Sequence, residues 1–69
     1  MKRSARNQIK GTVVKISPGA VNSEVLIKTD GGEFLTAIIT RESIQNLNLA
    51  EGKPVYAVIK ASDVMLAVD

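Results

Sequence analysis

The 69-residue chain contains no cysteine and no histidine, and these two absences exclude several kinds of chemistry. Without cysteine there is no disulfide, no thiolate metal site and no thiol nucleophile. Without histidine the chain lacks the commonest zinc ligand and the commonest general base at neutral pH. The seven acidic residues are scattered, and no pair of them has the spacing of a metal site or of an acid–base pair. The sequence therefore predicts a protein that is not an enzyme and that coordinates no metal directly through its side chains.

The chain also lacks any apolar run near the ~20 residues that cross a bilayer, which argues against a membrane protein. Its N-terminus is charged but has no apolar stretch of the signal-peptide kind, so we expect a cytoplasmic protein. The length predicts one domain, residues 1–69, and a chain of this size buries only about 60% of its unfolded surface. Since disulfides and a structural metal are excluded, oligomerisation is the remaining way to bury more apolar surface.

The β-branched residues fall in short segments bounded by turn signals, which is typical of an all-β protein. In the first segment Gly11 interrupts the run, and the alternation slips between Val13 and Val14, so we expect a β-bulge there. Residues 33–40 are apolar on both faces. We therefore expect apolar contacts on each side of that strand, with Phe34 in the core.

The predicted elements are five strands and one short helix. The strands are expected at residues 9–16, 21–29, 33–40, 54–60 and 64–68, and the helix at 41–47. Thr40 suits the N-cap of this helix, Glu42 its first turn, and Asn48 a left-handed residue after its last turn. Five strands in sequence, with one helix between the third and the fourth, is the element order of an OB-fold-like Greek-key barrel, which is the fold we predict.

OB-folds often bind single-stranded nucleic acid, and this is the alternative function. Such surfaces combine a basic groove with aromatic side chains on which bases stack. Here the only aromatic residues are Phe34 and Tyr56. Four of the nine basic residues do lie within the first ten positions, but a run of charge is usually a solvated segment. Binding of nucleic acid is therefore less favoured than the function developed below.

Hydrogen-bond donors gather in two segments, residues 4–8 and 60–62, at opposite ends of the sequence. In an extended chain residues i and i+2 face the same side, so the Ser4 hydroxyl and the Arg6 guanidinium can point at one site. Arginine offers a planar fork to an oxyanion, and Lys60 adds a point charge. The further candidates in these segments are the backbone N–H groups of Ala5 and Ala61 and the hydroxyl of Ser62. We predict that the fold brings both segments together around a small oxyanion; an ordinary edge-strand start with a surface lysine fits the same spacing.

The first of these segments resembles a known motif. Residues 4–11, Ser-Ala-Arg-Asn-Gln-Ile-Lys-Gly, resemble the opening of the molbindins, the small Mop-type proteins of the Mop/TOBE family that bind molybdate. Further matches are Pro18-Gly19-Ala20-Val21-Asn22 with Glu24-Val25, the turn Leu49-x-Glu51-Gly52-Lys53, and Ile59-Lys60-Ala61-Ser62 before Val64. The resemblance extends from about residue 3 to residue 68.

This resemblance implies a fold, an assembly and a ligand. Molbindins are OB-fold subunits that assemble as a trimer of dimers and store or buffer molybdate, and often tungstate, in the cytoplasm. They bind the intact oxyanion between subunits, through hydrogen bonds and positive charge. By resemblance, the residues that bind molybdate here are Ser4, Ala5, Arg6, Lys60, Ala61 and Ser62, with Thr40 and Ser43 of a neighbouring subunit. A second anion site in the family lies near the three-fold axis, and the loop Gly19-Ala20-Val21 is the candidate for it.

Overall fold

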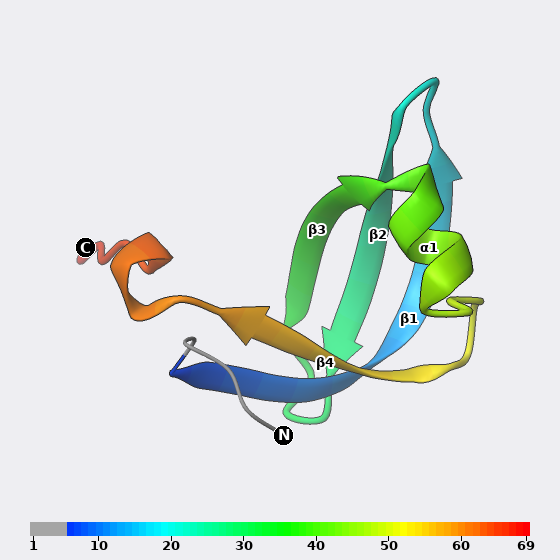
Figure 1. The fold of residues 1–69 in the computed structure, drawn as a ribbon. Coiled ribbons are helices and arrows are strands. Elements are labelled where there is room, and N and C mark those ends of the chain that lie inside the picture. Colours follow the sequence, from blue (N-terminus) through cyan, green and yellow to red (C-terminus); the bar gives the residue numbers. More distant parts are fainter. Residues whose placement is uncertain (1–5) are drawn as a thin grey trace.

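The computed structural model describes residues 6–69, which form a strongly curved antiparallel sheet with one short helix (Figure 1). In chain order the elements are β1 (Asn7–Pro18), β2 (Asn22–Thr29), β3 (Phe34–Thr40), α1 (Arg41–Asn46), β4 (Pro54–Ile59) and the short 3-10 turn η1 (Ala61–Asp63). The strand order is β3-β2-β1-β4, and every neighbouring pair is antiparallel. The predicted all-β architecture with a helix between the third and fourth strands is therefore confirmed.

The predicted fifth strand, residues 64–68, is wrong for the single chain, and the described residues form a sheet of four strands rather than a five-stranded barrel. Figure 1 shows the segment after η1 leaving the sheet, and Leu66 and Val68 are 93% and 97% exposed. The alternating apolar residues give this segment a strand pattern. A strand, however, is held by backbone hydrogen bonds to a neighbour, and no described part of the same chain supplies them.

The strand β1 is long because it pairs with two partners along different parts of its length. Its first half, from Asn7 to Thr12, pairs with β4, and its second half, from Gly11 to Pro18, pairs with β2. The register with β2 shifts between Val13 and Lys15, which confirms the predicted β-bulge. The bulge lets β1 bend, so that one strand can serve both ends of the curved sheet.

The core is small and lies on the concave side of this bend. Val13 and Val25 are each 1% exposed, and Ile27 completes the fully buried apolar set. Partly buried apolar side chains of β1, β3, β4 and α1 pack against it: Ile16, Leu35, Ala37, Ile39, Ile44 and Val55. With so few buried side chains, each one contributes a large share of the stability.

The helix α1 begins at the predicted residue, Arg41, and ends at Asn46, one residue earlier than predicted. Thr40 is the N-cap and its Oγ1 accepts a hydrogen bond of 3.0 Å from the N–H of Ser43. Asn48 has φ of 55°, as expected for a residue that terminates a helix in the left-handed region. Its N–H donates to the carbonyl of Gln45, and the Nζ of Lys53 donates to the carbonyls of Leu47 and Asn48. Lys53 thus ties the end of the helix to the start of β4.

The outer face of β3 differs from the prediction. Phe34, expected in the core, is 58% exposed, and the Nζ of Lys28 lies 5.8 Å from the centre of its ring. Ile38 is also exposed, whereas Leu35 and Ala37 face the core. Phe34 is the first residue of an edge strand, where no described element covers its side. Apolar contact on both faces of β3 remains a prediction, because contact on the exposed face requires the surface of a second protein molecule.

Gly11 occupies a position where the backbones of β1 and β2 approach closely. A Cβ at Gly11 would lie 2.6 Å from the carbonyl oxygen of Lys28 and 2.8 Å from Cγ2 of Ile27. We therefore expect Gly11→Ala to lower the free energy of unfolding by about 1–3 kcal/mol, because the strands must separate to admit the methyl group. Thermal unfolding followed by circular dichroism would measure this, with Thr12→Ala as the control on the exposed side of the same strand. An unchanged melting temperature for Gly11→Ala would contradict the close approach.

Candidate functional site

The end of the sheet where β1 begins and β4 ends brings the two predicted donor segments together. The last pair of this ladder is Asn7 with Ile59. Arg6, directly before Asn7, and Lys60, directly after Ile59, therefore lie side by side at the end of neighbouring strands. The Nδ2 of Asn7 donates a hydrogen bond of 3.3 Å to the carbonyl of Ile59. Arg6 and Lys60 are both exposed. The predicted candidates Ser4 and Ala5 lie outside the described residues.

Lys60 leads into η1, and the first N–H groups of this turn have no hydrogen-bond partner within it. The N–H of Asp63 donates to the carbonyl of Lys60 at 2.9 Å, which makes it the first N–H bonded within the turn. The N–H groups of Ala61 and Ser62 precede it and have no partner inside the turn. The three residues of η1 are exposed. This strand end, which we call the basic end, therefore presents two cations and two backbone donors, opposed by the carboxylate of Asp63.

The other predicted donors, Thr40 and Ser43, lie at the start of α1, at the opposite end of the molecule from the basic end (Figure 1). The hydroxyl of Thr40 donates to Oγ of Ser43 at 2.8 Å in addition to its capping contact. The single chain therefore does not bring Thr40 and Ser43 to Arg6 and Lys60. A site that contains all four residues needs two copies of the chain.

The loop Gly19-Ala20-Val21, the candidate for a second anion site, connects β1 to β2. The carbonyl of Val21 accepts a hydrogen bond of 3.1 Å from the N–H of Arg41, and Asn22 pairs with Thr40. The loop thus lies beside the start of α1, on the same end as Thr40. A Cβ at Gly19 would collide with the carbonyl oxygen of Asn22, so glycine is required for the tight return of the chain.

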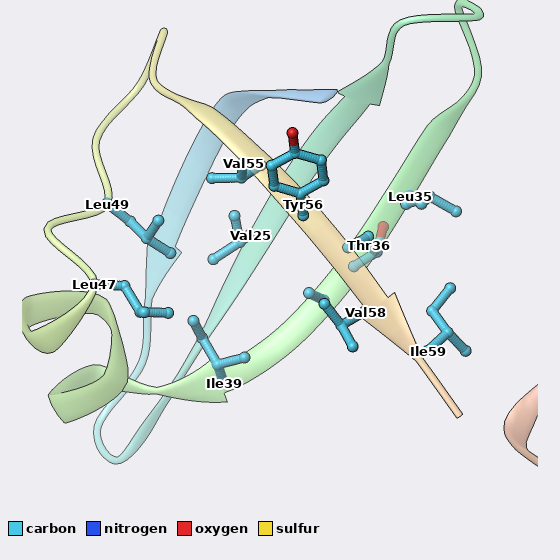
Figure 2. Close-up of a pocket in the computed structure, with 12 residues that line it drawn as sticks. Val25, Leu35, Thr36, Ile39, Leu47, Leu49, Val55, Tyr56, Val58 and Ile59 are labelled. Carbon is cyan, nitrogen blue, oxygen red and sulfur yellow. The ribbon is translucent and has the colours of Figure 1, made fainter. Parts of the chain in front are cut away.

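An apolar hollow of about 280 Å³ between β3, β4 and the segment after α1 was not predicted from the sequence (Figure 2). Figure 2 shows the β4 residues Val55, Tyr56 and Val58 beside Val25 and Ile39 of the neighbouring strands. The residues that line it are Val25, Leu35, Thr36, Ala37, Ile39, Leu47, Leu49, Val55, Tyr56, Ala57, Val58 and Ile59. This lining suits an apolar occupant rather than an anion. The alternation of Val55, Ala57 and Ile59 in β4 is the sequence signal that could have indicated it.

The described residues offer neither a metal site nor a membrane-spanning helix. Within residues 6–69 no group of three or more acidic, cysteine or histidine side chains could hold a metal ion. No helix in the described part of the chain has the length and apolar character to cross a membrane. The polar groups at the basic end are donors and cations, with one carboxylate, that of Asp63, beside them.

Together these features define a small curved-sheet domain whose donors lie at its two ends and whose concave face is apolar. Residues 3–66 match the TOBE domain, and the chain therefore belongs to the TOBE domain family. This confirms the resemblance to the Mop/TOBE proteins that the sequence motifs indicate.

Relatives and solved structures support the same family. The chain is 48% identical, over all 69 residues and the whole length of the relative, to a probable molybdenum-pterin-binding protein of Haemophilus influenzae. It resembles the structure of a molybdate-binding protein from Sporomusa ovata, with a TM-score of 0.92 and 34% identity over 99% of this chain and all of that one. It also resembles the cytoplasmic molybdate-binding protein ModG with molybdate bound, with a TM-score of 0.94 and 45% identity over the whole of this chain and 49% of that chain.

Proposed function

We propose that this protein binds molybdate, and tungstate through the same contacts, for storage or homeostasis in the cytoplasm, without catalysing a reaction. The observation that carries the proposal is the pairing of β1 with β4, which sets Arg6 beside Lys60 and the first N–H groups of η1. The relatives named for molybdenum or molybdate binding support the choice of ligand.

The proposed mechanism is recognition of an intact tetrahedral dianion. Arg6 contributes a planar pair of N–H donors, and Lys60 contributes a charge that also donates hydrogen bonds. The remaining donors are Ser4, Ala5, Ala61 and Ser62. Molybdenum keeps its own oxo ligands, so no side chain replaces them, in agreement with a chain that has no cysteine and no histidine.

We further propose that Thr40 and Ser43 reach the anion from a neighbouring subunit, because they lie at the far end of their own chain. Self-association as a trimer of dimers is supported by the apolar surface that one copy leaves open. Ile38, Met65 and Leu66 are 69%, 91% and 93% exposed, an unusual exposure for large apolar side chains in so small a protein. The loop Gly19-Ala20-Val21 is proposed as part of a second anion site.

In this assembly the segment 64–68 acts as the missing fifth strand. Its apolar side chains match the apolar hollow between β3 and β4 in chemistry, and both β3 and β4 are edge strands with unpaired backbone groups. We infer that the segment packs on a neighbouring copy and becomes extended there. The core that one chain lacks is then completed by the oligomer.

A titration with native mass measured alongside tests the function. We expect calorimetry to detect binding of molybdate and tungstate by a hexamer, and no binding of a short single-stranded oligonucleotide. Sulfate serves as the control for general attraction of a dianion to a protein of net charge +2. Binding of the oligonucleotide without molybdate would instead favour the nucleic-acid alternative, for which Phe34 and Tyr56 are the exposed aromatic residues. A protein that binds none of these ligands would refute both functions.

A further inference from the structure

The basic end is held together by a side chain that is not itself one of the proposed ligands of the anion. Asn7 and Ile59 form the last cross-strand pair, 52 positions apart in the sequence, and the Nδ2 of Asn7 donates to the Ile59 carbonyl at 3.3 Å. Asn7 is half-buried, whereas Arg6 before it and Lys60 after Ile59 are exposed. Asn7, the first residue of β1, is therefore the hydrogen-bonded side chain next to the two basic residues.

The hydrogen bond of Asn7 fixes the orientation of one peptide plane. The peptide unit that contains the carbonyl of Ile59 also contains the N–H of Lys60, and this unit is planar. Holding the carbonyl oxygen therefore sets the direction of the Lys60 N–H and of the chain that continues into η1. Beyond this point the chain enters the turn, in which the Lys60 carbonyl accepts from the N–H of Asp63. The carboxamide of Asn7 is thus a side-chain contact, in addition to the strand pairing, that can orient the start of the Lys60–Ser62 segment.

We propose that Asn7 is a positioning residue, which holds Lys60 and the following turn in the orientation that meets the anion beside Arg6. The inference rests on the proposed oxyanion site, because Asn7 acts through that site and does not touch the anion itself. The physical reason is preorganisation: donors that are already oriented lose less conformational freedom when a ligand binds. A role for Asn7 in strand pairing alone would affect stability and leave the affinity unchanged.

Asn7→Ala tests the proposal by two measurements on the assembled protein. Calorimetry is expected to show molybdate affinity lowered by about threefold or more, the effect of losing one orienting hydrogen bond. Hydrogen exchange is expected to be about tenfold faster at the amide of Asp63, which donates to the Lys60 carbonyl, while amides in the middle of β1 are unchanged. Asn46→Ala removes an exposed carboxamide at the end of α1 and is the matched control, expected to change neither quantity.

A double-mutant cycle separates positioning from a direct or a purely structural role. If Asn7 acts through Lys60, then Asn7→Ala lowers affinity less when Lys60 is already alanine. Additive losses, or an unchanged affinity of Asn7→Ala, would overturn the proposal even though the wild-type protein binds molybdate. If the wild-type protein binds no molybdate, the proposed function fails. Faster exchange at Asp63 in Asn7→Ala would still support the role of Asn7 in orienting the strand end.

Discussion

Arg6→Ala is expected to lower molybdate affinity by about tenfold or more, because loss of a charge-assisted hydrogen bond costs roughly 1.5–3 kcal/mol. Arg6 is exposed and precedes the first residue of β1, so its side chain contributes nothing to the core and the fold is expected to remain intact. Isothermal titration calorimetry gives the affinity, and a thermal melt of the same sample shows whether the fold has changed.

Two controls separate a specific contact of Arg6 from the overall charge of the protein. Lys15→Ala removes one positive charge at an exposed position of β1, near the bulge, and is expected to leave the affinity nearly unchanged. Arg6→Lys keeps the charge but loses the planar fork, so an intermediate affinity is expected. Equal losses for Arg6→Ala and Lys15→Ala would show that only net charge matters and would remove Arg6 from the site.

Leu66→Asp is expected to break the assembly while leaving the four-stranded sheet folded. Leu66 is 93% exposed in the single chain and makes no part of its core. In the proposed assembly it is buried against another copy, where an unpaired carboxylate costs several kcal/mol. Native mass spectrometry is expected to show species smaller than the hexamer. Molybdate binding is expected to fall with them, because the proposed site takes Thr40 and Ser43 from a neighbouring subunit.

The control for this variant adds the same charge elsewhere. Ala50→Asp places a carboxylate in the exposed connection between α1 and β4 and is expected to preserve both the hexamer and the affinity. Circular dichroism would establish that the sheet persists in Leu66→Asp. A hexamer that survives Leu66→Asp would exclude the segment 64–68 from the interface, and a wild-type monomer would exclude the intersubunit site altogether.

Several features that the sequence predicted correctly depend only on neighbouring residues. Thr40 caps α1, Asn48 terminates it in the left-handed region, and the slip at Val13–Val14 becomes a bulge. Each of these involves a side chain and a backbone within a few positions, where conformational preference and hydrogen bonding act directly. The predictions for 64–68 and Phe34 failed for the opposite reason. An apolar pattern shows that a segment can be covered, but it does not say whether its own chain provides the cover.

The sequence by itself determined the chemistry of this protein: an all-β chain without cysteine or histidine, with a Mop-type donor motif at its start and a second donor segment after residue 59. It also predicted that the two donor segments meet. Only the tertiary structure decided how, through the pairing of Asn7 with Ile59 across 52 positions, and it placed Thr40 and Ser43 at the other end. The physical reason is that side-chain chemistry belongs to each residue alone, whereas the distance between residues far apart in sequence is set by the strand pairing of the whole chain.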